Sequence, residues 1–129
     1  MRYQQLGKTG LEVSELGFGG IPILRLESGE AEKILRHAFD RGITFYDTAN
    51  AYHDSEAKMG RAFAGIRDKV IFATKTMKRD GAGALQQLEQ SLQRLQHQKS
   101  FGVFGKSYLK PKKSKHFGNK VFQTSKQNQ

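Results

Sequence analysis

The chain has 129 residues, the size of one ordinary domain, and a formal net charge of +10 at pH 7. It contains no cysteine, which excludes disulfides, thiolate metal sites and iron–sulfur clusters bound by this chain. No apolar run approaches the length of a membrane span, and residues 1–10 lack the apolar core of a signal peptide. We therefore expect a cytoplasmic protein without a membrane partner.

The positive charge is concentrated at one end of the chain. Residues 97–129 contain eight lysines and no arginine, aspartate or glutamate, so they carry +8, whereas residues 1–96 carry +2. The sequence thus divides into a near-neutral body, residues 1–96, and a basic tail, residues 97–129. Phenylalanines in the tail are scattered among lysine, glycine and serine. Apart from a short run at 101–104 we find no helical or strand period there, so we expect irregular structure.

The body begins with short predicted strands. Residues 2–5 and 11–14 flank a turn with Gly7 and Gly10 at its bends, which predicts a β-hairpin. A short apolar strand is predicted at 15–20, and a loop leads from it to the first helix.

Helices and strands then alternate along the chain. The predicted elements are a helix at 28–42, a strand at 43–47, a helix at 55–65, a strand at 69–75 and a helix at 80–96. The expected N-caps are Ser28 for the first helix, Asp54 or Ser55 for the second and Asp80 for the third. Gly42 fits just past the end of the first helix.

Apolar side chains recur at helical spacing in each predicted helix. Those expected to face the core are Ala31, Ile34, Leu35, Ala38 and Phe39, then Met59 and Phe63, then Leu85, Leu88, Leu92 and Leu95. This alternation predicts parallel strands covered by helices, in a doubly wound sheet or a (β/α)8 barrel. No G-x-G-x-x-G run follows the first strand, which weakens the case for a dinucleotide-binding doubly wound sheet.

Charged side chains end two of the predicted strands. Asp47 ends the strand at 43–47, and Lys75 ends the strand at 69–75. Counting back by twos gives the residues on their faces, which are Ile43, Phe45, Ile71 and Ala73. Both faces are apolar enough to point into a core. We therefore expect Asp47 and Lys75 side by side at the carboxyl ends of adjacent strands, with Tyr52 in the loop above them.

A tyrosine beside this pair suggests acid catalysis. A nearby ammonium group favours the phenolate form of a phenol and lowers its pKa, and a carboxylate paired with the lysine would fix its position. Such a phenol could donate a proton to a carbonyl oxygen while a nicotinamide or flavin cofactor supplies hydride, because no side chain supplies one. The alternative is a structural ion pair between Asp47 and Lys75, with Tyr52 as a packing residue.

Four segments of the body resemble the N-terminal part of the aldo-keto reductase family: YQQLGKTGLEVSELGFGG, AFDRGITFYDTANAYHDSE, VIFATK and LEQSLQRLQ. The resemblance covers residues 1–96, and the run G-I-T-F-Y-D-T-A-x-x-Y is its most specific part. It implies an NADP(H)-dependent oxidoreductase that acts on a small-molecule aldehyde or ketone. The implied fold is a (β/α)8 barrel whose bottom is closed by the N-terminal hairpin.

The resemblance also implies a role for each matching residue. Tyr52 would be the proton donor, Lys75 the group that makes its phenol more acidic, and Asp47 the anchor of Lys75. Gly20 and Ile21, together with Asp47, match positions that approach the cofactor. These roles come from the family pattern and not from spacing alone.

The sequence departs from the family pattern after residue 96. The family's catalytic set includes a histidine at the end of a fourth strand, and neither His97 nor His116 stands in such a place. A full barrel needs about 250 residues, and three βα units can be read here. We therefore expect a partial (β/α)8 TIM barrel with an N-terminal β-hairpin, about three βα units and an irregular basic tail. We expect it to be a truncated or frame-shifted, catalytically impaired form.

Open strand edges would make such a chain prone to self-association, to binding a partner or to marginal stability. One alternative function is therefore a half-barrel that assembles with a second chain. Another is a non-catalytic fragment whose basic tail binds nucleic acid. The tail carries no arginine and no recognised nucleic-acid-binding motif, so we do not expect this second activity.

Overall fold

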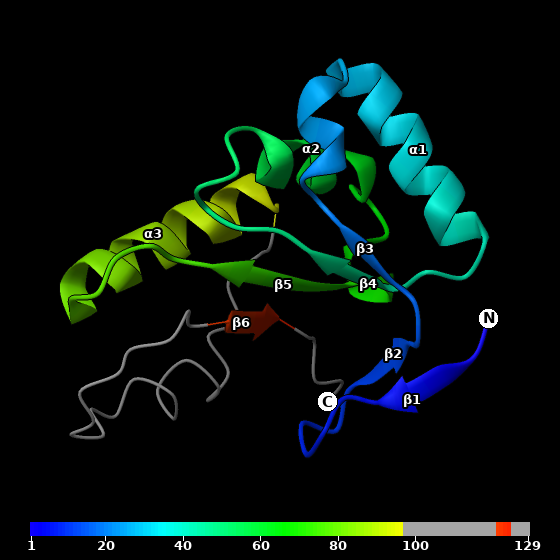
Figure 1. Cartoon of the computed structure of the whole chain (residues 1–129), viewed down its shortest axis with the longest axis horizontal. Coiled ribbons are helices and arrows are strands. Elements are labelled where there is room, and N and C mark those ends of the chain that lie inside the picture. Colours follow the sequence, from blue (N-terminus) through cyan, green and yellow to red (C-terminus); the bar gives the residue numbers. More distant parts are fainter. Residues whose placement is uncertain (97–120, 125–129) are drawn as a thin grey trace.

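The described part of the chain forms a four-stranded sheet, with three α-helices on one side and a separate β-hairpin at one end (Figure 1). The structure is a computed structural model that describes residues 1–96 and 121–124. The elements are β1 (Tyr3–Gln5), β2 (Glu12–Ser14), β3 (Gly17–Gly19), the 3-10 helix η1 (Pro22–Arg25), α1 (Ser28–Asp40), β4 (Phe45–Asp47), α2 (Ser55–Ala62), the 3-10 helix η2 (Arg67–Lys69), β5 (Ile71–Lys75), α3 (Gly81–Arg94) and β6 (Val121–Thr124). Within these residues, no helix is both long enough and apolar enough to cross a membrane.

The predicted N-terminal hairpin is confirmed. β1 and β2 pair antiparallel, and Gly7 and Gly10 in the turn have φ angles of 54° and 76°, which glycine adopts without steric cost. Ser14 ties the hairpin to the body: its N–H donates to Thr44 Oγ1 at 3.0 Å, and its Oγ accepts from the Thr44 N–H at 3.0 Å. Because Thr44 directly precedes β4, the hairpin lies at the amino end of the parallel strands.

The predicted parallel sheet is confirmed as well. β3 pairs with β4 in parallel, with Gly17 opposite Phe45 and Gly19 opposite Asp47. β4 pairs with β5 in parallel, with Phe45 opposite Ile71. Since α1 connects β3 to β4 and α2 connects β4 to β5, the body has the strand–helix alternation that the sequence predicts. The chain is therefore a partial α/β structure.

Two predicted helix caps have different outcomes. Asp80 caps α3, because its Oδ1 accepts from the Gly83 N–H at 2.7 Å. The prediction for α1 is wrong: Glu27 occupies the N-cap position, and it makes no side-chain cap hydrogen bond. Ser28 lies inside the helix, where its Oγ accepts from Arg61 Nη2 at 2.8 Å. The Ser28 hydroxyl thus joins α1 to α2 instead of capping its own helix.

The predicted apolar stripes of the helices are mostly buried. Buried members are Ala31, Leu35, Met59, Phe63, Leu88 and Leu95, and half-buried members are Ala38, Phe39 and Leu92. Ile34 is 41% exposed and Leu85 is 39% exposed, so the prediction that these two face the core is wrong. Both lie at the edge of their stripes, where a side chain points partly toward solvent and not toward the sheet.

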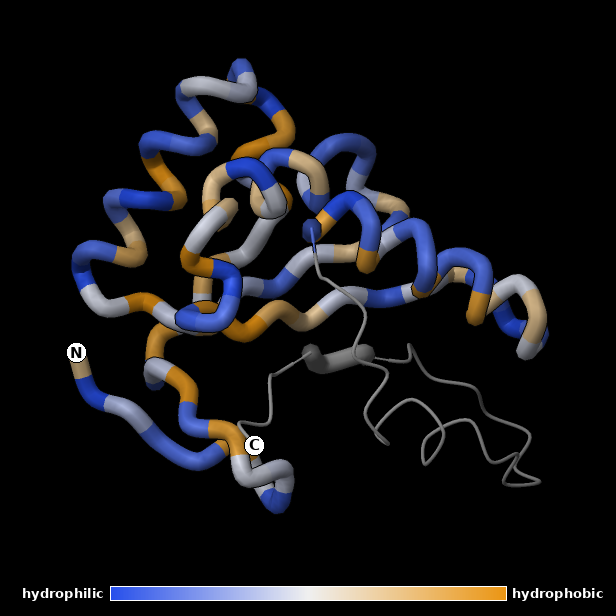
Figure 2. The backbone as a smooth tube through the Cα atoms, turned by 180° about the vertical axis from the view of Figure 1, so that it is seen from behind, coloured by the Kyte–Doolittle hydropathy of each residue, from blue (hydrophilic) through white to orange (hydrophobic). Residues whose placement is uncertain are grey.

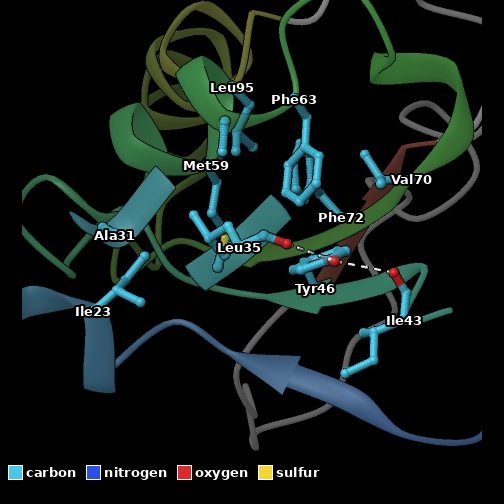
Figure 3. Packing of buried hydrophobic residues seen from close by; sticks show 11 residues of the cluster. Ile23, Ala31, Leu35, Ile43, Tyr46, Met59, Phe63, Val70, Phe72 and Leu95 are labelled. Carbon is cyan, nitrogen blue, oxygen red and sulfur yellow. Dashed lines mark hydrogen bonds between the residues drawn. The ribbon is translucent and has the colours of Figure 1, made fainter. Parts of the chain in front are cut away.

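The main apolar core lies between the sheet and its helices. Its cluster comprises Ile23, Ala31, Leu35, Ile43, Tyr46, Met59, Ala62, Phe63, Val70, Phe72 and Leu95 (Figure 3). The ring of Tyr46 lies 4.6 Å from that of Phe63 and 6.1 Å from that of Phe72, between centroids. The Tyr46 hydroxyl donates to the Ile43 carbonyl oxygen at 3.0 Å. Figure 2 shows hydrophobic residues along the strands and on the helix sides that turn toward them.

The sequence predicted that Ile43, Phe45, Ile71 and Ala73 point into a core, which in a complete barrel is its interior. The main cluster of this chain lies on the other side of the strands and contains Tyr46 and Phe72. Phe45 and Ile71 are half-buried, although Ala73 is buried. Ile43 belongs to the helix-side cluster, because β4 begins only at Phe45 and the strand alternation does not reach back to residue 43. In a complete barrel the Phe45 face would point into the interior.

One strand of the tail was not predicted. Val121–Thr124 forms β6, which pairs antiparallel with β5, with Val121 opposite Lys75 and Thr124 opposite Phe72 (Figure 1). A strand of four residues among lysines and polar residues has too little alternation to be found from sequence, because its pairing partner supplies its hydrogen bonds. The run at 101–104, and the irregular structure predicted for the rest of the tail, lie outside the described residues.

Candidate active site at the carboxyl ends of the strands

Asp47 and Lys75 meet at the carboxyl ends of β4 and β5. The Lys75 Nζ donates to Asp47 Oδ1 at 2.8 Å, to Asp47 Oδ2 at 2.6 Å and to the Thr48 carbonyl oxygen at 2.8 Å. These three acceptors match the three N–H donors of an ammonium group. The Lys75 side chain is 21% exposed and that of Asp47 is 43% exposed. The expected neighbours are therefore together, at a rim that is open to a ligand.

Tyr52 lies beside this ion pair. The Lys75 Nζ is 5.6 Å from the centroid of the Tyr52 ring, within the range of a cation–π interaction. The Tyr52 N–H donates to the Ala49 carbonyl oxygen at 3.0 Å, and the Tyr52 carbonyl oxygen accepts from the Ser55 N–H at 2.8 Å. Because the Lys75 donors all have acceptors in Asp47 and Thr48, the ammonium group acts on the Tyr52 ring through its charge.

The loop that carries Tyr52, residues 48–54, is held against both β5 and α3. The Asn50 N–H donates to the Lys75 carbonyl oxygen at 2.9 Å. The Asn50 Nδ2 donates to the Gln87 carbonyl oxygen at 3.3 Å and to Ser91 Oγ at 3.2 Å, both on α3. Sequence reasoning did not single out Asn50, because one asparagine in a loop carries no periodic signal. Its contacts hold the backbone near Tyr52 in place.

A buried hydroxyl network joins the ends of β3 and β4 to the start of α2. Thr48 Oγ1 donates to Ser55 Oγ at 2.9 Å, and Ser55 Oγ donates to the Gly20 carbonyl oxygen at 3.2 Å. The Gly20 N–H donates to the Asp47 carbonyl oxygen at 2.7 Å. A Cβ on Gly20 would lie 2.5 Å from Ser55 Oγ, so this position requires glycine for internal packing. Gly20 thereby fixes the backbone of Asp47.

A second polar contact supports the end of β5 from the helix side. Glu56 on α2 is fully buried, and its Oε1 accepts from Thr74 Oγ1 at 2.7 Å. Its Oε2 accepts from Arg94 Nη1 at 3.3 Å. Since Thr74 directly precedes Lys75, this carboxylate links α2 and α3 to the residue next to the site lysine. Glu56 could not be singled out from the sequence, because exposed and buried glutamates look alike in a short helix.

Three residues were expected to contact a cofactor, and they differ in accessibility. Gly20 is buried, Ile21 is 57% exposed and the Asp47 side chain is 43% exposed. Ile21 directly follows Gly20, so an exposed apolar side chain and an exposed carboxylate follow neighbouring strands at one rim. An apolar side chain suits the face of a flat aromatic ring, and a carboxylate accepts from amide or hydroxyl donors. Ile21 and Asp47 together therefore offer contacts suited to a planar ring that carries hydrogen-bond donors.

The remaining candidates for chemistry in the described residues are few. Among residues 1–96 and 121–124, no group of three or more histidine, aspartate or glutamate residues could hold a metal ion. His37 on α1 and His53 in the loop are exposed, and neither contacts the Asp47–Lys75 pair. His97 and His116 lie outside the described residues. We assign the family's fourth catalytic position to none of these histidines.

The arrangement of Asp47, Lys75 and Tyr52 is suited to acid catalysis. An ammonium group anchored by a carboxylate stabilises the phenolate that remains after a phenol donates its proton. The carboxyl ends of parallel strands are the usual position of functional groups in (β/α)8 barrels.

Comparison with protein families finds one family that matches most of the body. Residues 15–104 match the model described as "Aldo/keto reductase family". The match contains all five predicted site residues and extends past the boundary expected at residue 96.

Individual relatives agree with the family match. The chain is 37% identical over 115 residues to "Aldo-keto reductase YhdN" of Bacillus subtilis (strain 168), covering 74% of this chain and 35% of that relative. It is 37% identical over 79 residues to "Probable aldo-keto reductase 1" of Glycine max, covering 55% of this chain and 23% of that relative. The chain thus spans about a third or less of the length of these curated relatives.

A solved structure shares the fold. The holo form of an aldo-keto reductase from Bacillus halodurans superposes with a TM-score of 0.68 and 34% sequence identity, covering 74% of this chain and 37% of that chain. The described body therefore has the architecture of one portion of a (β/α)8 barrel reductase.

Proposed function

Because the chain belongs to the aldo/keto reductase family, we propose that Asp47, Lys75 and Tyr52 form the proton-donating part of a site that reduces an aldehyde or ketone with NADP(H). Family membership supports oxidoreductase chemistry in general. The contact of the Lys75 ammonium with both the Asp47 carboxylate and the Tyr52 ring is the observation that carries the proposal.

Each residue has a separate part in the proposed step. The Tyr52 hydroxyl donates its proton to the carbonyl oxygen of the substrate. Lys75 stabilises the negative charge that then remains on the phenol oxygen, because its positive charge lies next to the ring. Asp47 holds Lys75 in place and balances its charge. Asn50 keeps the loop in position through α3, so that little reorganisation is needed when substrate binds.

Ile21 and Asp47 would contact the nicotinamide end of the cofactor. The Ile21 side chain offers an exposed apolar surface, and the Asp47 carboxylate offers acceptor oxygens. Bound NADP(H) supplies the hydride that no side chain can provide. Gly20 acts indirectly, because it is buried and holds the Asp47 backbone through its N–H.

We propose slow turnover for this 129-residue chain on its own. The chain spans 35% of the length of its Bacillus subtilis relative, and no histidine among the described residues contacts the Asp47–Lys75 pair. A rate near the enzyme median of about 10 per second would contradict this part of the proposal.

The test is a single-turnover assay with protein in excess over NADPH and a small aromatic aldehyde. Cofactor fluorescence and oligomeric mass are followed together. We expect slow, stoichiometric loss of NADPH fluorescence with the unmodified chain and none with Tyr52→Phe, since phenylalanine has no proton to donate. Tyr3→Phe in the hairpin is the matched control, and it should behave like the unmodified chain. Equal rates for the unmodified chain and Tyr52→Phe would rule out Tyr52 as the proton donor.

A further inference from the structure

The outer edge of β5 is covered by the chain's own tail. β5 pairs with β4 on one side and with β6 on the other, in the order β3-β4-β5-β6 (Figure 1). The pairs between β6 and β5 run from Val121 opposite Lys75 to Thr124 opposite Phe72. The Ala73 and Lys75 carbonyl oxygens accept from Thr48 and Asn50 on the β4 side, so an uncovered outer edge would present the N–H and C=O groups of Phe72 and Thr74. Such groups readily pair with a strand of another chain.

The direction of β6 separates it from the strands before it. β3, β4 and β5 are parallel. A helix connects β3 to β4, and another connects β4 to β5. A strand that continued this series after α3 would lie parallel to β5, because a right-handed crossover returns the chain in the same direction. β6 instead runs antiparallel and follows residues 97–120. It therefore occupies the position of a further parallel strand without being the next member of the series.

The sequence around β6 is suited to ending a sheet. Lys120 directly precedes β6 and Lys126 lies two residues beyond its end. Lysines near an edge strand discourage further pairing, because two copies that meet edge to edge bring like charges together. Residues 121–124 can therefore cover the edge of β5 without leaving an outer edge that pairs as readily with another chain.

We propose that residues 121–124 are an intramolecular edge cap for β5. The surface that they cover, residues 72–75, is a strand-docking surface that fits an extended antiparallel segment, and the cap keeps it from pairing with a second copy of this chain. Because Lys75 is the last residue of that surface, the cap also covers the backbone edge beside the site lysine. The proposal concerns assembly, so it does not depend on the proposed reductase step.

A disulfide test examines the cap directly in the full-length chain. The chain has no cysteine, so two introduced cysteines are the only thiols. Ala73 and Gln123 are opposite each other, and we expect Ala73→Cys/Gln123→Cys to form a disulfide within one chain on mild oxidation. The control is Ala73→Cys/Val121→Cys, in which the second cysteine is two residues out of register. Its yield should be lower by about tenfold or more, because diagonal pairs lie too far apart for an unstrained disulfide.

The products on a non-reducing gel decide between the outcomes. A fast-migrating monomer formed selectively by the in-register pair supports the cap. Equal yields from both pairs, no disulfide from either, or a disulfide that joins two chains would each overturn it. The last result would mean that the tail strand pairs between copies.

The effect on assembly is measured by light scattering over a range of protein concentrations. We expect Phe122→Pro/Gln123→Pro to self-associate more strongly than the unmodified chain, because proline removes backbone donors from β6. Ser107→Pro/Ser114→Pro, with the same number of prolines outside β6, should match the unmodified chain. An unchanged mass for Phe122→Pro/Gln123→Pro would overturn the proposal. If that variant does not fold, oxidised Ala73→Cys/Gln123→Cys must self-associate less than its reduced form, and equal masses would overturn the proposal.

Discussion

The two faces of the parallel strands differ in what they contribute. On the helix-covered face, Tyr46, Phe63 and Phe72 have no exposed surface, and their rings contact one another. On the opposite face, Phe45 and Ile71 are only half-buried, and Asp47 and Lys75 reach the rim. The helix-covered face therefore holds the main apolar core, and the opposite face carries the candidate site. Substitutions on the two faces should separate stability from function.

Burial changes the acidity of two ionisable groups at the helix-covered face. Burial raises the pKa of Tyr46 well above its usual value, and the negative charge of Asp40 acts in the same direction. Burial lowers the pKa of Arg67 to about 10, although the charge of Asp68 opposes this shift. The Arg67 guanidinium lies 4.2 Å from the centroid of the Phe72 ring. Burial against the core therefore affects both the Tyr46 phenol inside it and the Arg67 guanidinium at its margin.

Phe63→Ala should have the largest effect. Phe63 is fully buried and contacts the rings of Phe39, Tyr46 and Phe72. Removing a buried phenylalanine side chain costs about 3–5 kcal/mol of unfolding free energy. Urea denaturation measures the loss. The matched control, Phe45→Ala on the half-buried face, should cost clearly less, and equal costs for the two variants would show that the faces do not differ as described.

Glu56→Ala should have the next largest effect. It removes the acceptor of the Thr74 hydroxyl and the partner of Arg94, beneath the site. A buried donor left without an acceptor costs about 1–3 kcal/mol, and more when a charged hydrogen bond is lost as well. Glu56→Gln keeps an acceptor oxygen for Thr74, so its loss in urea denaturation should be smaller. If Glu56→Gln destabilised the chain as much as Glu56→Ala, the hydrogen bond to Thr74 would not be the main contribution.

Tyr46→Phe should cost about 1 kcal/mol at neutral pH, because it removes a buried hydroxyl that donates to the Ile43 carbonyl oxygen at 3.0 Å and, more weakly, to the Leu35 carbonyl oxygen at 3.4 Å. The pH dependence of the stability of this variant is more diagnostic. Below the pKa of an unfolded tyrosine, about 10, the phenol is neutral in both states. Above it the unfolded phenol ionises first, because the pKa of Tyr46 is raised in the folded chain, so stability falls as pH rises.

Chemical denaturation at pH 8 to 11 measures this slope. Tyr46→Phe should lose stability less steeply with rising pH than the unmodified chain. Parallel slopes for the two proteins would contradict a buried neutral phenol at position 46.

Lys75→Met should have the smallest effect on stability. The ion pair with Asp47 is partly exposed, and pairs of this kind contribute about 0–1 kcal/mol. The same substitution should abolish the single-turnover loss of NADPH fluorescence, since it removes the charge next to Tyr52. Thermal denaturation and the fluorescence assay on one preparation make the comparison. A large loss of stability with intact activity would reverse the roles assigned to the two faces.

The sequence predicted the site better than the core. Asp47 and Lys75 end two apolar strands, and the parallel order of those strands was enough to bring the two side chains together. The helix-covered core around Tyr46 and Phe72 was not predicted, because both faces of β4 and β5 are apolar, as they are whenever a parallel sheet is buried on two sides. Tyr46 and Phe72 could be assigned to the helix side only once the helices were in place.

Contacts that depend on distant residues were not predictable. Asn50 reaches α3, Glu56 reaches Thr74 and Arg94, and Ser28 binds Arg61 instead of capping α1. None of these partners is near in sequence, so no local pattern indicates them. β6 was missed for the same reason, because a four-residue strand is defined by the edge that it pairs with.

The most direct test of the account is an NMR measurement of proximity in the free protein. Cross-relaxation between the Lys75 side-chain methylenes and the Tyr52 ring protons should be observed, because the Lys75 Nζ lies 5.6 Å from the ring centroid. Contacts between the rings of Tyr46 and Phe63, 4.6 Å apart between centroids, provide the internal reference. If the reference contacts are seen while Lys75 shows none to Tyr52, the ammonium group and the phenol do not share a site, and the proposed acid catalysis is wrong.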